Sequence, residues 1–183
     1  MDSRYLNTIL QWPLKAFVTA VGIVLFWLVT HNNKPVAGLT AKNFNARPYF
    51  ILLLLMLPLL LIAGQGADFQ KIYPKLQMAS GHLSCLQTLF FEACYGLDFF
   101  TIELFFRGFI ILAFIKYTGK DAILPMAVFY CTIHFGKPVA ECISSYFGGL
   151  ILGAVVYNTK SIWGGLIIHL GIAWMMEGVG LLY

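Results

Sequence analysis

The residues of this sequence that could do chemistry lie inside long apolar runs. Glu103 and Arg107 stand four residues apart in LDFFTIELFFRGFI, a spacing that puts both side chains on one face of a helix, about one turn apart. His134 stands near the end of FYCTIHFGKP, and His169 stands inside SIWGGLIIHLGIAWMMEG. A charged side chain at mid-bilayer costs about 2.5–3.5 kcal/mol, so each such group needs a partner or a polar cavity. A carboxylate and imidazoles gathered at one wet site could activate water for hydrolysis.

Each of these residues also has a purely structural interpretation. The pair of Glu103 and Arg107 could be a buried ion bridge that only fixes helix packing. A lone histidine on an apolar helix is more often a packing residue than a catalytic one. Two histidines and an ion pair on three separate segments favour the functional interpretation.

The order and spacing of these residues resemble the CPBP intramembrane proteases, also called the CAAX-protease and bacteriocin-processing (Abi-like) family. That family shows EExxxR, FxxxH and HxxxN or HxxxD on successive helices, and the similarity covers about residues 95–182. IELFFRG supplies the first motif, His134 the second and His169 the third. The resemblance implies an intramembrane endopeptidase that hydrolyses a peptide bond of a membrane-associated protein or peptide. It also implies a glutamate-type mechanism without a metal or another cofactor.

The resemblance further implies a role for each matched residue. Glu103 and His134 would orient and deprotonate the attacking water, and His169 would donate a hydrogen bond to the developing oxyanion. Arg107 would hold Glu103 in place. The sequence has no HExxH, which leaves a zinc site unsupported, and no G-x-S-x-G, which argues against a serine nucleophile.

Three positions depart from the family pattern. Ile102 replaces the leading Glu of the first motif, Tyr130 replaces the Phe of the second, and Ala173 replaces the Asn or Asp of the third. The change at Tyr130 keeps the aromatic ring. The other two changes remove a water-activating carboxylate and a hydrogen-bonding side chain.

Two other carboxylates could replace the missing one. Glu141 follows His134 by seven residues, at the predicted start of the next helix. Glu177 lies eight residues beyond His169, about 80° round the helix from it. The alternative for Glu141 is a first-turn acid favoured by the helix dipole, and the alternative for Glu177 is an interfacial residue near the C-terminus.

The elements that must position these residues are membrane helices. Of the 183 residues 60% are hydrophobic and 11% are charged, and a water-soluble surface cannot be built from this composition. The sequence predicts an all-α, polytopic transmembrane bundle with about six hydrophobic segments: 16–30, 48–64, 89–117, 122–136, 139–157 and 161–182. The fourth segment is only marginally long enough to cross a bilayer.

The longest polar connection, 65–82, divides the chain into two predicted parts. These are N-terminal membrane anchors with their connecting loop, 1–82, and a CPBP-like catalytic helical core, 83–183. In the fifth segment Ser145, Gly149 and Gly153 recur every four residues, which predicts close packing against a neighbouring helix. The four cysteines have no metal-binding spacing and are interpreted as small core residues.

The net charge of +4 comes mainly from Lys and Arg residues between the apolar runs, where they meet lipid headgroups, so no nucleic-acid partner is predicted. The predicted partners are membrane lipids and a membrane-embedded peptide or protein substrate, for an integral protein of the cell (inner) membrane. Two alternatives remain open. One is a non-catalytic pseudoprotease of the same fold with a binding or immunity role, favoured by Ile102 and Ala173. The other is a small proton-coupled transporter.

Overall fold

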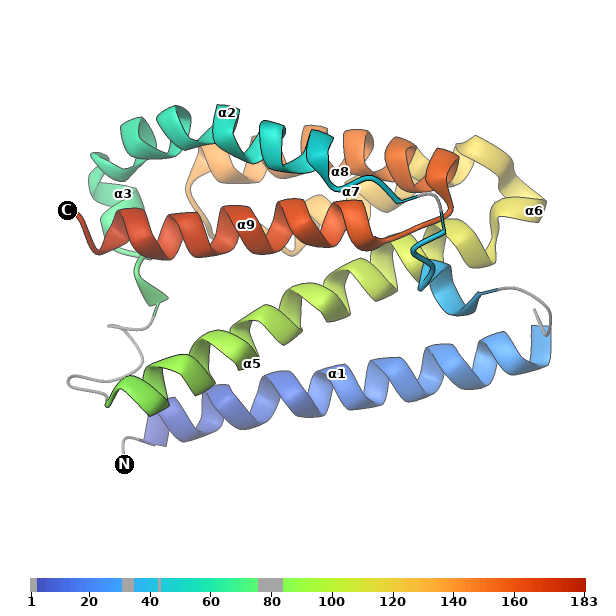
Figure 1. Ribbon diagram of the computed structural model, residues 1–183, viewed down its shortest axis with the longest axis horizontal. Coiled ribbons are helices and arrows are strands. Elements are labelled where there is room, and N and C mark those ends of the chain that lie inside the picture. Colours follow the sequence, from blue (N-terminus) through green and yellow to red (C-terminus); the bar gives the residue numbers. More distant parts are fainter. Residues whose placement is uncertain (1–2, 31–34, 43, 76–83) are drawn as a thin grey trace. The chain divides into compact units, whose positions relative to one another are not determined.

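The chain consists of helices and loops in a computed structural model that describes residues 3–30, 35–42, 44–75 and 84–183, and these residues include no strand (Figure 1). The longer helices are α1 (Ser3–Thr30), α2 (Arg47–Gly64), α5 (Cys85–Glu103), α8 (Val139–Thr159) and α9 (Trp163–Gly180). The shorter elements are η1 (Val36–Gly38), α3 (Ala67–Gln70), η2 (Leu104–Ala113), α6 (Ile115–Thr118), η3 (Gly119–Ala122) and α7 (Ile123–Thr132). The predicted all-α class is confirmed.

The first helix begins well before the apolar run that predicted it. Tyr5 and Ile9 are buried in one cluster with Phe91 and Cys94 of α5. Trp12 packs edge-on against Phe91, with ring centroids 5.3 Å apart. Because these side chains recur at helical spacing between more polar neighbours, the start of α1 is an amphipathic helix, which a search for apolar runs does not detect.

The third predicted segment, 89–117, is not one uniform helix. It comprises α5, the π-helical element η2 and the short helix α6. The fourth segment corresponds to α7, which has 10 residues. At about 1.5 Å per residue such a helix rises about 15 Å, half of a hydrocarbon core of about 30 Å.

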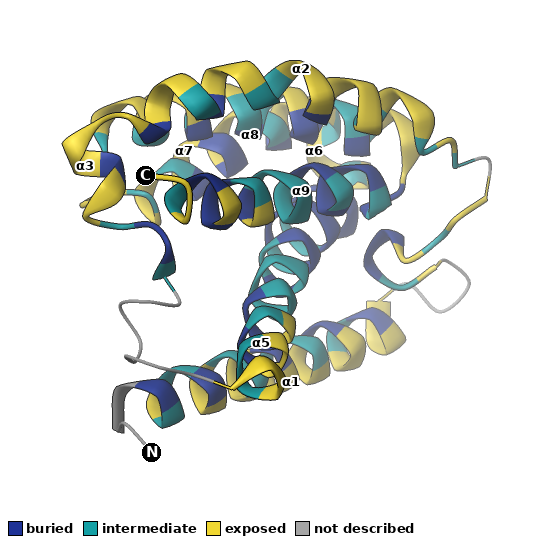
Figure 2. Ribbon diagram, turned by 60° about the vertical axis from the view of Figure 1, so that its left-hand side comes forward, coloured by how far each residue is buried: buried dark blue, intermediate teal, exposed yellow. Residues whose placement is uncertain are grey.

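Among the described residues three helices are long and apolar enough to cross a membrane: α1 from Tyr5 to Thr30, α2 and α8. On α8 the side chains of Val139, Ile143, Phe147 and Ile151 form a stripe at intervals of four residues, and each is at least 55% exposed. Exposed faces of this kind run along α1 and α2 as well (Figure 2). Continuous apolar faces that no part of the protein covers are suited to lipid.

The chain divides into two compact units. The first comprises residues 1–17, 47–100 and 167–183, and the second comprises residues 18–46 and 101–166. Besides the cluster around Phe91, the first unit has a core of Leu60, Phe69, Tyr73, Met176 and Val179. The predicted boundary between residues 82 and 83 lies outside the described residues, so the division into anchors and core stays a prediction.

In the second unit α7 and α8 pack closely through small residues. A Cβ atom on Gly149 would lie 3.3 Å from Ala127, and one on Gly153 would lie 3.0 Å from Ile123. Ser145 belongs to the same buried face of α8. The predicted small-residue face is therefore confirmed, and its neighbour is the helix that precedes His134.

Candidate active site

Glu103 and Arg107 form an ion pair in the interior of the second unit. Glu103 is the last residue of α5 and Arg107 lies in η2, and both side chains are 0% exposed. Arg107 Nη1 lies 3.2 Å from Glu103 Oε1. The predicted pairing within one segment is confirmed. A carboxylate taken out of water needs this kind of compensation, because an isolated buried charge costs several kcal/mol.

The element that holds Arg107 is wound as a π-helix and is covered by η1. π-helical turns are rare in proteins and are frequent at functional sites. Gly108 follows Arg107, and a Cβ atom there would lie 2.6 Å from the carbonyl oxygen of Ala37. Ala37 is fully buried and has a left-handed backbone, with φ 46° and ψ 34°. The backbone of η1 therefore packs directly on η2 beside the arginine.

Tyr130 of α7 connects the arginine to His134. The guanidinium carbon of Arg107 lies 4.2 Å from the centroid of the Tyr130 ring, in a cation–π arrangement. On its other side Tyr130 packs edge-on against the His134 ring, with centroids 4.8 Å apart. The Tyr130 side chain is buried, with 4% exposure. Glu103, Arg107, Tyr130 and His134 thus form a continuous row of contacts across η2 and the end of α7.

Gly165, in the first turn of α9, covers the carboxylate of Glu103. A Cβ atom at Gly165 would lie 2.9 Å from Glu103 Cδ and closer still to Oε2. No other residue type fits there without moving the carboxylate. Neither Gly165 nor Tyr130 is among the predicted site residues. The sequence features that could have indicated them are the two glycines after Trp163 at the start of a helix and the YxxxH spacing of Tyr130 and His134.

Glu141 takes part in a different interaction. It lies in the first turn of α8, and its Oε1 atom is 2.6 Å from Lys137 Nζ. The two side chains are 17% and 29% exposed, respectively. This geometry suits the predicted first-turn acid, and the role of Glu141 as a second catalytic carboxylate stays a prediction.

The remaining predicted residues belong to the first unit. The ring of His169, on α9, lies 6.1 Å from the ring of Phe99 on α5. Glu177 is 6% exposed, and its Oε1 atom accepts a hydrogen bond of 3.0 Å from the backbone N–H of Lys75. Ala173, between them on α9, is 3% exposed, so the position without the expected amide or carboxylate is a packing position.

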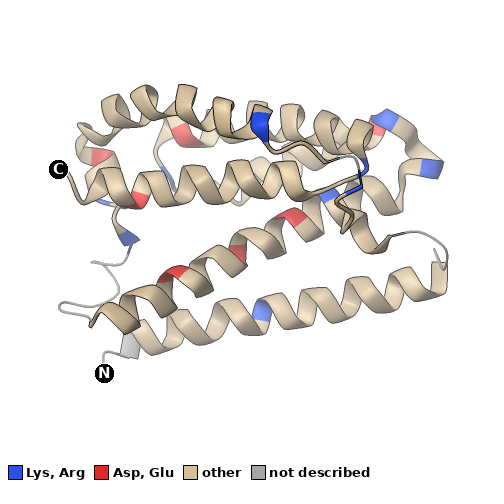
Figure 3. Cartoon of the chain, in the orientation of Figure 1, with Lys and Arg blue, Asp and Glu red and all other residues tan. Residues whose placement is uncertain are grey.

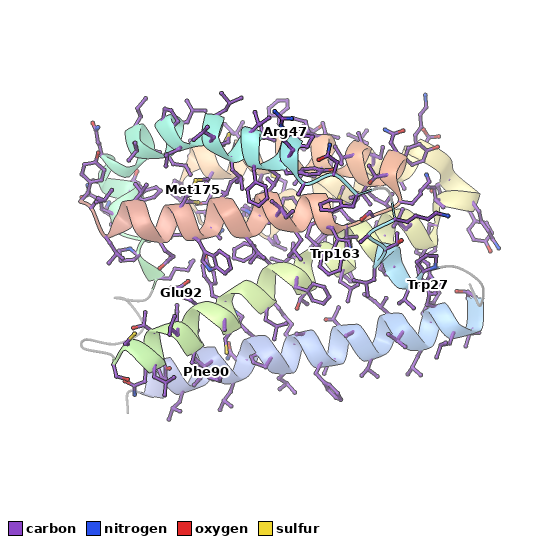
Figure 4. All side chains as sticks on the ribbon, viewed as in Figure 1. Trp27, Arg47, Phe90, Glu92, Trp163 and Met175 are labelled. Carbon is purple, nitrogen blue, oxygen red and sulfur yellow. The ribbon has the colours of Figure 1, made fainter. Side chains whose placement is uncertain are left out.

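The acidic positions of α5 follow one another along the helix (Figure 3). Asp98 forms an ion pair with Lys15 of α1 in the first unit. Glu92 and Phe90 project from opposite sides of α5 (Figure 4). Across the described ranges no group of three or more His, Cys, Asp or Glu side chains is arranged to hold a metal ion.

The chain thus combines apolar faces suited to lipid with a buried Glu–Arg pair that contacts a Tyr–His pair. The model of the Rce1-like family, type II CAAX prenyl endopeptidases, matches residues 84–175, half of the chain, and the chain belongs to this family. No curated protein and no solved structure is significantly similar to the chain. The family and the three apolar helices indicate an integral membrane protein.

Proposed function

We propose that the chain is an intramembrane endopeptidase that hydrolyses a peptide bond of a membrane-associated protein or peptide. The observation that carries the proposal is the fully buried pair of Glu103 and Arg107, linked through Tyr130 to His134 in a chain of this family. A buried carboxylate with its cation, connected to a half-buried imidazole, provides groups that can act as general bases on water.

In the proposed mechanism Glu103 and His134 orient the attacking water and accept its proton. The water oxygen bonds to the scissile carbonyl carbon, and the proton then passes to the leaving amide nitrogen as the C–N bond breaks. Arg107 fixes the position of Glu103, and His169 donates to the oxyanion. The family resemblance supports all of these roles, and the contacts in the second unit support those of Glu103, Arg107 and His134.

The ion pair of Glu103 and Arg107 is fully enclosed, so the proposed mechanism requires the site to open. Both Glu103 and Arg107 have no accessible surface, so water and substrate reach the carboxylate only when the covering side chains move. Gly165 covers the carboxylate on one side, and Tyr130 covers the guanidinium on the other. Local opening of this kind is common in enzymes that keep water out of the site between turnovers.

The finer parts of the proposal concern the membrane. We propose that the chain has about six membrane segments, with α7 reaching only partway across, and that it resides in the cell (inner) membrane. Its substrate would be a peptide segment at or in the same membrane. A prenylated C-terminal peptide is the first substrate to test, because the family is described by that activity.

A non-catalytic binding role is the second candidate. It is favoured by Ile102, which stands where a second carboxylate is expected, and by the packing role of Ala173. A protein of this kind would bind a membrane peptide and release it uncut. A proton-coupled transporter is not favoured by any contact described above.

The test is a cleavage assay in proteoliposomes with a panel of prenylated and unmodified membrane peptides. Glu103→Gln and His134→Ala should each lower the cleavage rate by at least about 100-fold, the usual contribution of general base catalysis. Asp68→Asn is the control, because Asp68 pairs with Lys71 on the surface, and it should cleave at the wild-type rate.

Protein level and helix content are measured in parallel for every variant. Gln at position 103 keeps the size of the side chain but leaves the buried Arg107 charge without its carboxylate, so rates are compared only for protein with wild-type helix content. Wild-type cleavage by folded Glu103→Gln protein would refute the role of Glu103 and would direct attention to Glu141 or Glu177. Binding without cleavage by the wild-type protein would favour the non-catalytic role.

A further inference from the structure

Tyr130 contacts both nitrogen atoms of the His134 ring. Nδ1 lies 3.3 Å from the backbone carbonyl oxygen of Tyr130, and Nε2 lies 3.5 Å from its hydroxyl oxygen. Both distances exceed the roughly 2.7–3.2 Å typical of protein hydrogen bonds. Hydrogen bonds of catalytic groups are often long before substrate binds and shorten in the complex.

The chemistry of these two partners determines the protonation of the ring. A carbonyl oxygen only accepts hydrogen bonds, so Nδ1 must carry the proton. In a neutral imidazole Nε2 then has the lone pair and accepts from the phenol O–H. The neutral tautomer that satisfies both contacts has its basic nitrogen at Nε2, facing the Tyr130 hydroxyl.

The position of the Tyr130 hydroxyl is itself fixed. The ring is held between the Arg107 guanidinium and the His134 ring, and Phe106 packs against it with centroids 5.3 Å apart. A Cβ atom on Gly149 of α8 would lie 3.3 Å from the same ring, so α8 leaves no room for a larger residue beside it. A buried ring with neighbours on several sides cannot swing away, so its hydroxyl is a preorganised donor.

We propose that Tyr130 is a positioning residue that clamps His134 by both ring nitrogens and presents Nε2 as the base. This inference rests on the proposed function, because it names the residue that orients one of the two proposed bases. The hydroxyl group of Tyr130 is the part of the side chain that this positioning role requires. Phe at this position would keep the ring over Arg107 and the carbonyl contact to Nδ1, but would remove the hydroxyl from both Nε2 and Arg107.

The direct test is ¹⁵N NMR of the histidines in the full chain in detergent micelles at neutral pH, with the His134 signals assigned by a His134→Gln variant. In the wild type Nδ1 should be protonated, and Nε2 should be an unprotonated nitrogen that accepts a hydrogen bond. In Tyr130→Phe the Nε2 signal should move to the position of an unprotonated nitrogen without a donor. A protonated Nε2 in the wild type, or identical Nε2 signals in both proteins, would overturn the clamp.

Cleavage kinetics give the second readout. Tyr130→Phe should lower kcat about tenfold with KM unchanged, since one hydrogen bond of about 1.4 kcal/mol corresponds to that factor. The control is Tyr117→Phe, at a site that is 72% exposed, which should leave kcat and the His134 signals unchanged. Equal kcat for Tyr130→Phe and wild type would overturn the positioning role.

The two readouts separate this inference from the proposed function. A wild-type protein that shows the predicted Nε2 signal and cleaves no peptide would refute the peptidase while the clamp stands. A wild-type protein that cleaves, with a Tyr130→Phe variant equal to it in both readouts, would refute the clamp while the peptidase stands.

Discussion

At the scale of single residues, the proposed site centres on the ion pair of Glu103 and Arg107, which has no solvent-accessible surface. Ion pairs of this kind contribute little net stability, because desolvation offsets most of their attraction. Breaking them is costly, since the remaining charge has no partner. Glu103 and Arg107 are both 0% exposed, so they fall in this class.

Replacing the arginine should therefore destabilise the protein strongly. We expect Arg107→Met to lower the free energy of unfolding by about 3–5 kcal/mol, because it leaves the Glu103 carboxylate buried alone. The double variant Glu103→Gln/Arg107→Met should recover most of that loss. Unfolding by denaturant in detergent micelles measures both, and a loss below about 1 kcal/mol for Arg107→Met would show that the pair is not enclosed.

The glycine over the carboxylate gives a second prediction at this scale. Gly165→Ala should lower the cleavage rate at least about tenfold, because the new methyl group would occupy the place of the Glu103 carboxylate. Gly178→Ala is a matched control on the same helix, since a Cβ atom there meets nothing within 4 Å. It should leave the rate unchanged and raise stability by up to about 1 kcal/mol through helix propensity. Equal rates for the two variants would contradict the placement of α9 over Glu103.

Part of the site was predictable from the residues alone. The spacing of Glu103 and Arg107 within one helix is sufficient to predict their contact, because helix geometry is local. The contacts of Tyr130 and Gly165 depend on how α7 and α9 pack against η2, and no local pattern encodes that packing. The sequence has Tyr130 where the family motif has Phe. The contact of its hydroxyl with His134 is known only from the fold.

At the scale of elements, apolar runs predicted the helices well and their irregularities poorly. All six predicted segments overlap helices, because burial in lipid or core requires long runs of the same residue types. The π-helical element η2 also makes a close tertiary contact. Gly108 lets the carbonyl of Ala37 approach the backbone, and nothing in the local sequence signals that partner.

The contact between η1 and η2 is open to a direct test. Gly108→Ala should destabilise the protein by about 1–3 kcal/mol, because the new methyl group would lie 2.6 Å from the backbone oxygen of Ala37, which cannot move as a side chain would. Gly148→Ala on α8 is the control, since nothing lies within 4 Å of its Cβ position. The midpoints of thermal unfolding compare the two, and a Gly108→Ala variant as stable as the control would disprove the close approach.

At the scale of the whole molecule, the composition and the uncovered faces of α1, α2 and α8 agree on a membrane environment. The family match covers residues 84–175, and Glu103, Arg107, Tyr130 and His134 within that range are in contact in the second unit. Composition alone predicted the membrane environment, because the preference for lipid over water depends on the average residue of the chain. The chemistry depends on a few side chains, and it could be predicted only as far as motifs fix their spacing.

The central claim is that Glu103 directs a water molecule onto a peptide carbonyl within the membrane protein. The most direct measurement is mass spectrometry of the cleavage product formed in H₂¹⁸O by wild-type protein in proteoliposomes. We expect one ¹⁸O atom in the new C-terminal carboxylate, and no such product from folded Glu103→Gln protein. A product without ¹⁸O, or a labelled product formed by Glu103→Gln at the wild-type rate, would contradict it.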